Sequence, residues 1–365
     1  MSILQWRNWK VFSKINLLII PAIVPILLVT WFTYKVQRNA SIETSQHIIQ
    51  LITEKSGSAH EAYLEKHYDE FRRWTAGAKS YGTSIENGTL AETRKTFQQM
   101  KASTHDFTLL LLADKKGKAL IAIGDTAEAT TNLEGTTVPE ATRLAQSGHL
   151  AFSLETSHVL QMIGADFSRT YIFSAPCYDS SGDPNGVFLA YMDWTAFQKQ
   201  VFDTAHVLQE NGFPDACAMM VDASESKSLI DSDKANGQDS WTASKSLQTF
   251  FNNIENENTT QPFKWDGQIN YVSYASLSSG EKLNEKTGRS TADATSLRLA
   301  VFVPFSNVLA EPRAMMWENI VIAVIGSIVL FVAFRIVSNT ICKPLTRTVK
   351  WLELIGDGDL TIRLE

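Results

Sequence analysis

The stretch Phe107–Gly124 reads FTLLLLADKKGKALIAIG and decides the fold of this 365-residue chain. Two apolar runs flank the tetrapeptide Asp-Lys-Lys-Gly, a pattern typical of two antiparallel strands joined by a turn. A second hairpin is predicted for Arg169–Asp193, RTYIFSAPCYDSSGDPNGVFLAYMD, whose longer turn contains Gly, Pro, Asp and Asn.

Predicted helices accompany these strands. The segment VPEATRLAQSG lies between the hairpins and is expected to pack on the sheet, and Trp194–Gln209 is expected to form a helix that leaves it. Residues 105–210 are therefore predicted to form one antiparallel α+β module.

The same order of elements returns in a smaller copy. The segment ACAMMVDASESKSLIDSD (216–233) predicts strand, turn and strand, and SWTASKSLQTFFNNI (240–254) predicts a helix. A closing hairpin is expected from INYVSYASL (269–277) and SLRLAVFVP (296–304). Residues 211–314 are therefore predicted to form a second α+β module.

A long helix is predicted ahead of both modules. Between Arg38 and about Tyr81 the chain has no proline, and apolar residues recur at spacings of three and four. About 45 such residues make a helix of roughly 65–70 Å, which predicts a stalk within a helical region of residues 35–104. His60 and His67 are expected on its polar surface, because they lack partners at metal-ligand spacing.

Two uncharged runs predict membrane-spanning helices. Residues 15–34 carry no charge, and neither do residues 320–334 within a predicted span of 315–337. Basic residues flank the outer ends of both runs, so residues 1–14 and the C-terminal segment are expected in the cytoplasm. The segment between the runs carries more acidic than basic residues, which argues against a nucleic-acid partner.

The sequence shows no catalytic or cofactor motif. No G-x-S-x-G, P-loop, H-E-x-x-H or C-x-x-C pattern occurs, so no enzymatic activity, metal or cofactor is expected of these residues. A disulfide between Cys177 and Cys217 is possible outside the cytoplasm. Because the two cysteines fall in separate predicted modules, we interpret them as free buried thiols.

The order of these elements resembles the double-Cache family of bacterial extracytoplasmic sensors. Three segments carry the resemblance. The family's first hairpin is similar to LLLADKKGKALIAIG, its closing hairpin to FSAPCYDSSGDPNGVFLAYMD, and its last strand before the second span to LRLAVFVPFSNVLAEP. The resemblance implies an α+β fold with two PAS-like modules, the first of them membrane-distal. It also implies a homodimeric, multi-pass protein of the inner membrane, with its sensor in the periplasm or outside the cell.

The segment ICKPLTRTVKWLELIGDGDL (341–360) resembles the first helix and early connector of a HAMP domain. A proline suits the first turn of a helix, and a glycine suits its end. We expect residues 338–365 to be an incomplete HAMP unit that passes a signal to an output domain beyond them. Five residues are candidates for this transmission: Pro344, Leu345, Gly358, Asp359 and Leu360.

Six residues of the first module are candidate ligand contacts: Asp193, Tyr191, Asp166, Tyr171, Phe173 and Phe152. Tyr191 and Asp193 share a strand face, and a carboxylate at the end of a buried strand can hold an ammonium group. Asp193 can equally cap the helix that starts at Trp194, and both roles stay open. The aromatic side chains can line a pocket or pack in the core.

The resemblance implies that an aspartate at position 193 contacts a ligand amine, and it matches Asp166 to the family's Tyr-x-Asp. Gly164 stands in place of that tyrosine, and the family's carboxylate-binding Arg-x-Trp-Tyr has no counterpart. Both departures weigh against an α-amino acid as the ligand.

The sequence therefore predicts a transmembrane receptor for an amine, an amino acid or an organic acid. Its layout resembles methyl-accepting chemotaxis receptors, which act on cytoplasmic signalling proteins. Two alternatives remain open: the sensor part of a histidine kinase or cyclic-dinucleotide enzyme, and a module that recognises a periplasmic binding protein.

Overall fold

The computed structural model describes residues 11–125, 130–145, 150–165, 169–222, 227–231, 241–242, 250, 260–265, 267–277, 297–337, 339–340, 344, 348–349 and 351–352. The chain forms two compact units. One contains Met1–Ser45 and Val308–Glu365, and the other contains Gln46–Asn307.

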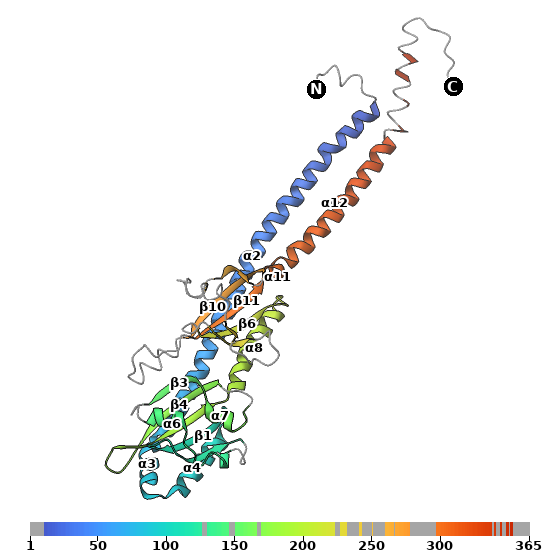
Figure 1. Ribbon diagram of the computed structural model, residues 1–365. Coiled ribbons are helices and arrows are strands. Elements are labelled where there is room, and N and C mark those ends of the chain that lie inside the picture. Colours follow the sequence, from blue (N-terminus) through green and yellow to red (C-terminus); the bar gives the residue numbers. More distant parts are fainter. Residues whose placement is uncertain are drawn as a thin grey trace. The chain divides into compact units, whose positions relative to one another are not determined.

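The predicted long helix is confirmed as α2 (Val11–Trp74), which passes alongside both sheets of the second unit (Figure 1). Its expected end near Tyr81 is wrong. The helix ends in a 3-10 turn, η1 (Thr75–Gly77), where the hydroxyl of Tyr81 donates to the carbonyl of Trp74 at 3.1 Å. This bond satisfies a carbonyl that lacks a helical partner at the end of α2.

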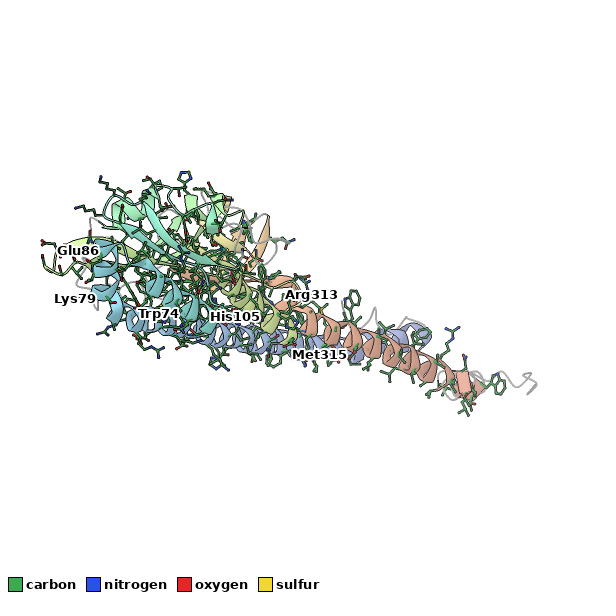
Figure 2. The ribbon with its side chains drawn as sticks, turned by 90° about the horizontal axis from the view of Figure 1, so that it is seen from below. Trp74, Lys79, Glu86, His105, Arg313 and Met315 are labelled. Atoms are coloured by element: carbon green, nitrogen blue, oxygen red, sulfur yellow. The ribbon has the colours of Figure 1, made fainter. Side chains whose placement is uncertain are left out.

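Two shorter helices follow the turn, α3 (Ala78–Asn87) and α4 (Leu90–Ser103). Figure 2 shows Trp74 at the end of α2, with Lys79 and Glu86 on α3. Glu86 accepts hydrogen bonds from the backbone and the hydroxyl of Ser180, both at 3.1 Å, so α3 is joined to the turn of the second hairpin.

The five-stranded sheet is antiparallel, with the strand order β2-β1-β5-β4-β3. Its strands are β1 (Phe107–Asp114), β2 (Ala119–Gly124), β3 (Ala151–Thr156), β4 (Arg169–Tyr178) and β5 (Pro184–Met192). Both predicted hairpins are confirmed, because β1 pairs with β2 and β4 pairs with β5. The edge strand β3 was not predicted.

Helices cover both faces of this sheet. On the face that we call the α2 face, the buried ring of Phe188 lies 5.0 Å from that of Phe71 in α2 and 4.7 Å from that of Phe97 in α4. The opposite face, the α6–α7 face, lies under α6 (Pro139–Ala145) and α7 (His158–Met162). Apolar side chains of both helices join the core there.

The six-stranded sheet has the order β8-β7-β6-β11-β10-β9. Its strands are β6 (Cys217–Asp222), β7 (Lys227–Asp231), β8 (Trp241–Thr242), β9 (Gln261–Trp265), β10 (Gln268–Leu277) and β11 (Leu297–Pro304). The pairs β6–β7 and β10–β11 confirm the two predicted hairpins.

The helix predicted over residues 240–254 is wrong at its start, where Trp241 pairs with Ser228 as part of β8. Residues 240, 243–249 and 251–254 of that segment lie outside the described residues, and Phe250 is helical. A separate helix, α8 (Trp194–Glu210), connects the two sheets along the chain, as predicted. Gly57 lets α2 approach β10, since a Cβ there would lie 2.5 Å from the Cβ of Ala275.

The other unit contains the first part of α2 and α12 (Ala310–Val337). In the part of the chain that the structure describes, α12 is the one helix that is long and apolar enough to cross a membrane. It begins ahead of the predicted residue 315. The first predicted span stays a prediction, because the side chains of residues 11–23 lie outside the described part.

Candidate functional site

Tyr191 lies on the α6–α7 face of the five-stranded sheet. It stands opposite Ile172 across the β4–β5 ladder, and both side chains are buried. Ala141 of α6 and Leu160 of α7 belong to the same buried cluster. This face therefore offers an apolar wall with one tyrosine in it.

Glu140 brings a carboxylate to the same pair of helices. The residue lies in the first turn of α6 and is only 6% exposed. Its Oε1 accepts the backbone N–H of His158, the first residue of α7, at 2.6 Å. Its Oε2 is buried and has no hydrogen-bond partner among the residues that the structure describes. An open carboxylate oxygen in a buried position is a strong acceptor for a ligand cation.

The sequence did not identify Glu140 as a site residue. The sequence carries one partial signal: the apolar residues Val138, just before α6, and Ala141 and Leu144 within it follow helical spacing. Glu140 stands directly beside this stripe, so its carboxylate is carried into the covered side of the helix. Only the packing of α6 on the sheet shows that this position is buried.

The predicted aromatic residues are divided between the two faces of the sheet. The ring of Phe152 lies 4.8 Å from that of Tyr171 and 5.2 Å from that of Phe173, so these three form one cluster. Phe173 also lies 5.6 Å from Phe71 of α2, which places the cluster on the α2 face. Tyr191 pairs with Ile172, which lies between Tyr171 and Phe173 on β4. Because successive residues of a strand point to opposite faces, a single pocket lined by all four aromatic residues is wrong.

Asp193 caps α8. Its Oδ1 accepts the backbone N–H of Thr195 at 2.8 Å, and the residue has the extended backbone conformation of an N-cap. Its own N–H donates to the carbonyl of Asp106 at 2.7 Å. The capping role that the sequence left open is thus confirmed, and the role of Asp193 in ligand binding stays a prediction.

A polar network joins α2 to the residues just before β1. His67 is fully buried, and its Nε2 lies 2.7 Å from Oδ2 of Asp106 while its Nδ1 lies 2.6 Å from the carbonyl of Tyr63. Burial, followed by the charges of Asp106 and Asp193, raises the pKa of Tyr63. Partial burial acts to raise the pKa of Asp106, but the hydrogen bond and charge of His67 hold it below its ordinary value.

The expected exposure of His60 and His67 is wrong, because both are buried beneath the two modules. The Nδ1 of His60 lies 2.7 Å from the carbonyl of Ser56, and its ring meets Phe197 of α8 edge-on at 5.5 Å. Burial lowers the pKa of His60. The residues 46–74 of α2 are thus a core helix as well as a stalk.

The remaining candidates are placed as follows. Asp166 lies outside the described residues, as do Leu345, Gly358, Asp359 and Leu360, whereas Pro344 is described as helical. Cys177 is a buried thiol, and Cys217 is only partly buried. Burial raises the pKa of the Cys177 thiol to about 12. Across the described ranges, no three His, Cys, Asp or Glu side chains gather as metal ligands would.

No protein-family model matches the sequence, and no curated protein is significantly similar to it. The fold is nevertheless similar to solved structures of chemoreceptor sensory domains. The sensory domain of the Campylobacter jejuni chemoreceptor Tlp3 (CcmL) matches with a TM-score of 0.52 at 10% identity, over 74% of this chain and 98% of that chain. The same domain with isoleucine bound gives 0.50 at 10% identity, over 74% and 97%.

The ligand-binding domain of the Pseudomonas fluorescens chemoreceptor CtaA, in complex with L-isoleucine, gives a TM-score of 0.47 at 14% identity, over 75% of this chain and 98% of that chain. The likeness to Tlp3 concerns the fold. The chain has the α+β fold of chemoreceptor sensory domains, with a long N-terminal helix and antiparallel sheets.

Proposed function

We propose that this chain is a transmembrane receptor that binds a small solute outside the cytoplasm and passes a conformational signal to a cytoplasmic output. The observation that carries the proposal is the fold: two antiparallel sheets share one long helix, and the chain then continues into the apolar α12. Tlp3, whose sensory domain has a similar fold, is a chemoreceptor with structures that contain isoleucine or L-valine.

In this proposal both apolar segments cross the membrane. Large apolar side chains between Val24 and Val36 of α2 are exposed, as are those between Val321 and Val337 of α12. Exposed apolar surface of this extent favours a lipid environment. With the basic flanks in the cytoplasm, residues 46–307 lie outside, and a homodimer would place two copies of each span side by side.

The proposed ligand is a solute with an ammonium group and an apolar part, such as an aliphatic amine. Oε2 of Glu140 can accept a hydrogen bond from the ammonium group, and the wall around Tyr191 and Ile172 can accept the apolar part. Asp193 can still contribute with the oxygen that does not cap α8. A carboxylate as the main anchor makes a purely anionic organic acid the least suitable of the three predicted ligand classes.

The proposed output is chemotaxis, through a HAMP unit that includes residues 338–365. Ligand binding would change the equilibrium between two arrangements of the helices that lead to the membrane. A coupling of about 1–3 kcal/mol is typical of such a step. A kinase or cyclic-dinucleotide output would leave the sensor mechanism unchanged.

The proposal is tested by thermal unfolding of the full chain in lipid nanodiscs with amines, amino acids and organic acids. A ligand at 100 times its Kd adds about 2.7 kcal/mol, which moves the midpoint by several degrees. Glu140→Gln is expected to abolish the shift, because it removes the charge but keeps an acceptor for His158.

Glu92→Gln is the matched control, since Glu92 stands in the first turn of α4 but is exposed. It is expected to leave the ligand-induced shift intact. A folded protein that shows no shift with any solute would overturn direct sensing and favour recognition of a binding protein. A shift that survives Glu140→Gln would overturn the proposed anchor alone.

A further inference from the structure

A second cavity lies in the six-stranded module, away from Glu140 and α6. It has a volume of about 680 Å³, which lies within the range of small-molecule sites. The end of α8, the loop before β6, the β9–β10 turn and the end of β11 supply its walls. Six of its lining residues carry the argument: Gln209, Asp215, Cys217, Trp265, Asn270 and Ser306.

The walls of this cavity, which we call the Trp265 cavity, are held by specific hydrogen bonds. Oδ2 of Asp215 accepts from the side chain of Asn307 at 2.8 Å, and the backbone N–H of Asp215 donates to the same side chain at 3.1 Å. The side-chain amide of Gln209 donates to the carbonyl of Ala216 at 3.2 Å. Contacts within the protein therefore hold the walls of the cavity in place.

The lining can bind a polar solute. Asn270 is only 6% exposed, yet within the described part of the chain its side-chain amide makes just a long contact of 3.5 Å with the carbonyl of Gln268. It therefore retains hydrogen-bonding capacity for a guest. Trp265 adds an aromatic surface, with its ring 5.0 Å from that of Phe302.

The charge of the lining selects the sign of the solute. Among the lining residues that the structure describes, Asp215 is the one carboxylate, and there is no lysine, arginine or histidine. A carboxylate beside an aromatic ring favours cations through a charge-assisted hydrogen bond and a cation–π contact. The described lining offers an anion no positive side chain.

We propose that the Trp265 cavity is a second ligand site that takes a small organic cation. The ammonium or guanidinium group binds at Asp215, and the rest of the molecule packs on Trp265. The site goes beyond the proposed receptor function and does not depend on the Glu140 anchor.

The cavity also lies next to the route toward the membrane helix. Pro304 and Ser306 line it, and they belong to the end of β11 and to α11 (Phe305–Val308), which precede α12 in the chain. A bound cation therefore contacts the segment that any signal to α12 must pass. The site is thus suited to modulate the receptor rather than only to store a solute.

Cys217 gives a direct readout, because it lines the cavity and is partly exposed. The full chain in nanodiscs is alkylated with iodoacetamide, and the peptide that contains Cys217 is quantified by mass spectrometry. Agmatine, choline and ethanolamine are the cationic probes, and malonate and glycerol are the controls. A probe at ten times its Kd leaves about one cavity in eleven empty, so alkylation is expected to slow about tenfold.

Asp215→Asn is expected to raise the apparent Kd of the best probe about tenfold, because it removes the charge from the hydrogen bond. Asp203→Asn is the matched control, since Asp203 is an exposed acid of α8. It is expected to leave protection unchanged, as is Glu140→Gln. The rate of Cys217 alkylation without probe checks that each variant keeps the cavity.

Several results would overturn the site. One is equal protection by malonate or glycerol, and another is an equal Kd for Asp215→Asn and Asp203→Asn. If no probe slows the alkylation of Cys217 at any concentration, the proposed site is excluded as well. Failure of Cys217 to react even without a probe would contradict an accessible cavity. None of these results bears on the Glu140 anchor, whose loss is seen in the thermal shift.

Discussion

The contact between His67 and Asp106 is the most specific link between α2 and the five-stranded module, and replacing Asp106 by asparagine tests it. Nδ1 of His67 faces the carbonyl of Tyr63, which can only accept, and Nε2 faces the Asp106 carboxylate at 2.7 Å. Lys66 adds a cation at 3.8 Å from the same oxygen.

The expected magnitude follows from burial. His67 is fully buried, whereas the Asp106 side chain is 32% exposed. A hydrogen bond to a charged group contributes about 1.5–3 kcal/mol. Asparagine keeps an acceptor oxygen but loses the charge, so Asp106→Asn is expected to cost about 1–2 kcal/mol of the free energy of unfolding.

The assay is a double-mutant cycle of Asp106→Asn and His67→Leu, measured by thermal unfolding of the full chain in nanodiscs at pH 7. A coupling energy of about 1–2 kcal/mol is expected, because each single change removes the same bond. Asp69→Asn is the control, since Asp69 is exposed on the same helix. It is expected to change stability by less than about 0.5 kcal/mol.

The pH dependence supplies an independent check. The folded pKa of Asp106 is lowered, so its contribution is present above the ordinary aspartate pKa and is lost as pH falls through the lowered value. The difference in midpoint between the parent and Asp106→Asn is therefore expected above about pH 4 and is expected to shrink as the pH falls below that value. A coupling near zero at pH 7, or a difference unchanged at pH 3, would refute the reasoning.

Two further substitutions test the packing of the helices on the five-stranded sheet. Phe188→Ala is expected to lower the free energy of unfolding by about 3–5 kcal/mol, because the buried ring contacts Phe71 and Phe97, whereas Phe188→Leu keeps most of the volume and costs less. Gly82→Ala is expected to destabilise by about 1–3 kcal/mol despite the better helix propensity of alanine, because a Cβ there would overlap the backbone of Tyr178. Chemical or thermal unfolding measures both, with Ser84→Ala of the same helix as the control, and a neutral Gly82→Ala would contradict the close approach of α3 to β4.

Much of the strand pattern could be predicted because hairpins are local. When two apolar runs flank a turn of Asp, Gly, Asn or Pro, each run is the strand partner of the other, and the turn fixes the register of their pairing. Three strands were missed, namely β3, β8 and β9. Each pairs with a neighbouring strand but lacks a strong apolar pattern of its own: β8 has two residues, and β9 is largely exposed. These strands pair with the free edge of a strand already in the sheet, and the sequence of the pairing segment does not show that edge.

The end of α2 and the burial of its histidines could not be predicted for the same physical reason. Helical periodicity continues past Trp74, and the turn there depends on the hydroxyl of Tyr81 reaching back to the carbonyl of Trp74. His60 and His67 look like polar surface in the sequence. They become core residues only because α8 and β1 cover them, with Phe197 and Phe107 against their rings.

The sequence by itself determined the α+β class, the order of the hairpins, the long helix and the apolar character of α12, because each depends on neighbours within one turn or one hairpin. The tertiary structure decided which faces are covered and which polar groups are buried. It separated Tyr191 from Phe152, Tyr171 and Phe173, and it buried the carboxylate of Glu140. The Trp265 cavity depends on Asp215 and Asn307, which lie 92 positions apart, and such contacts exist only once distant segments pack together.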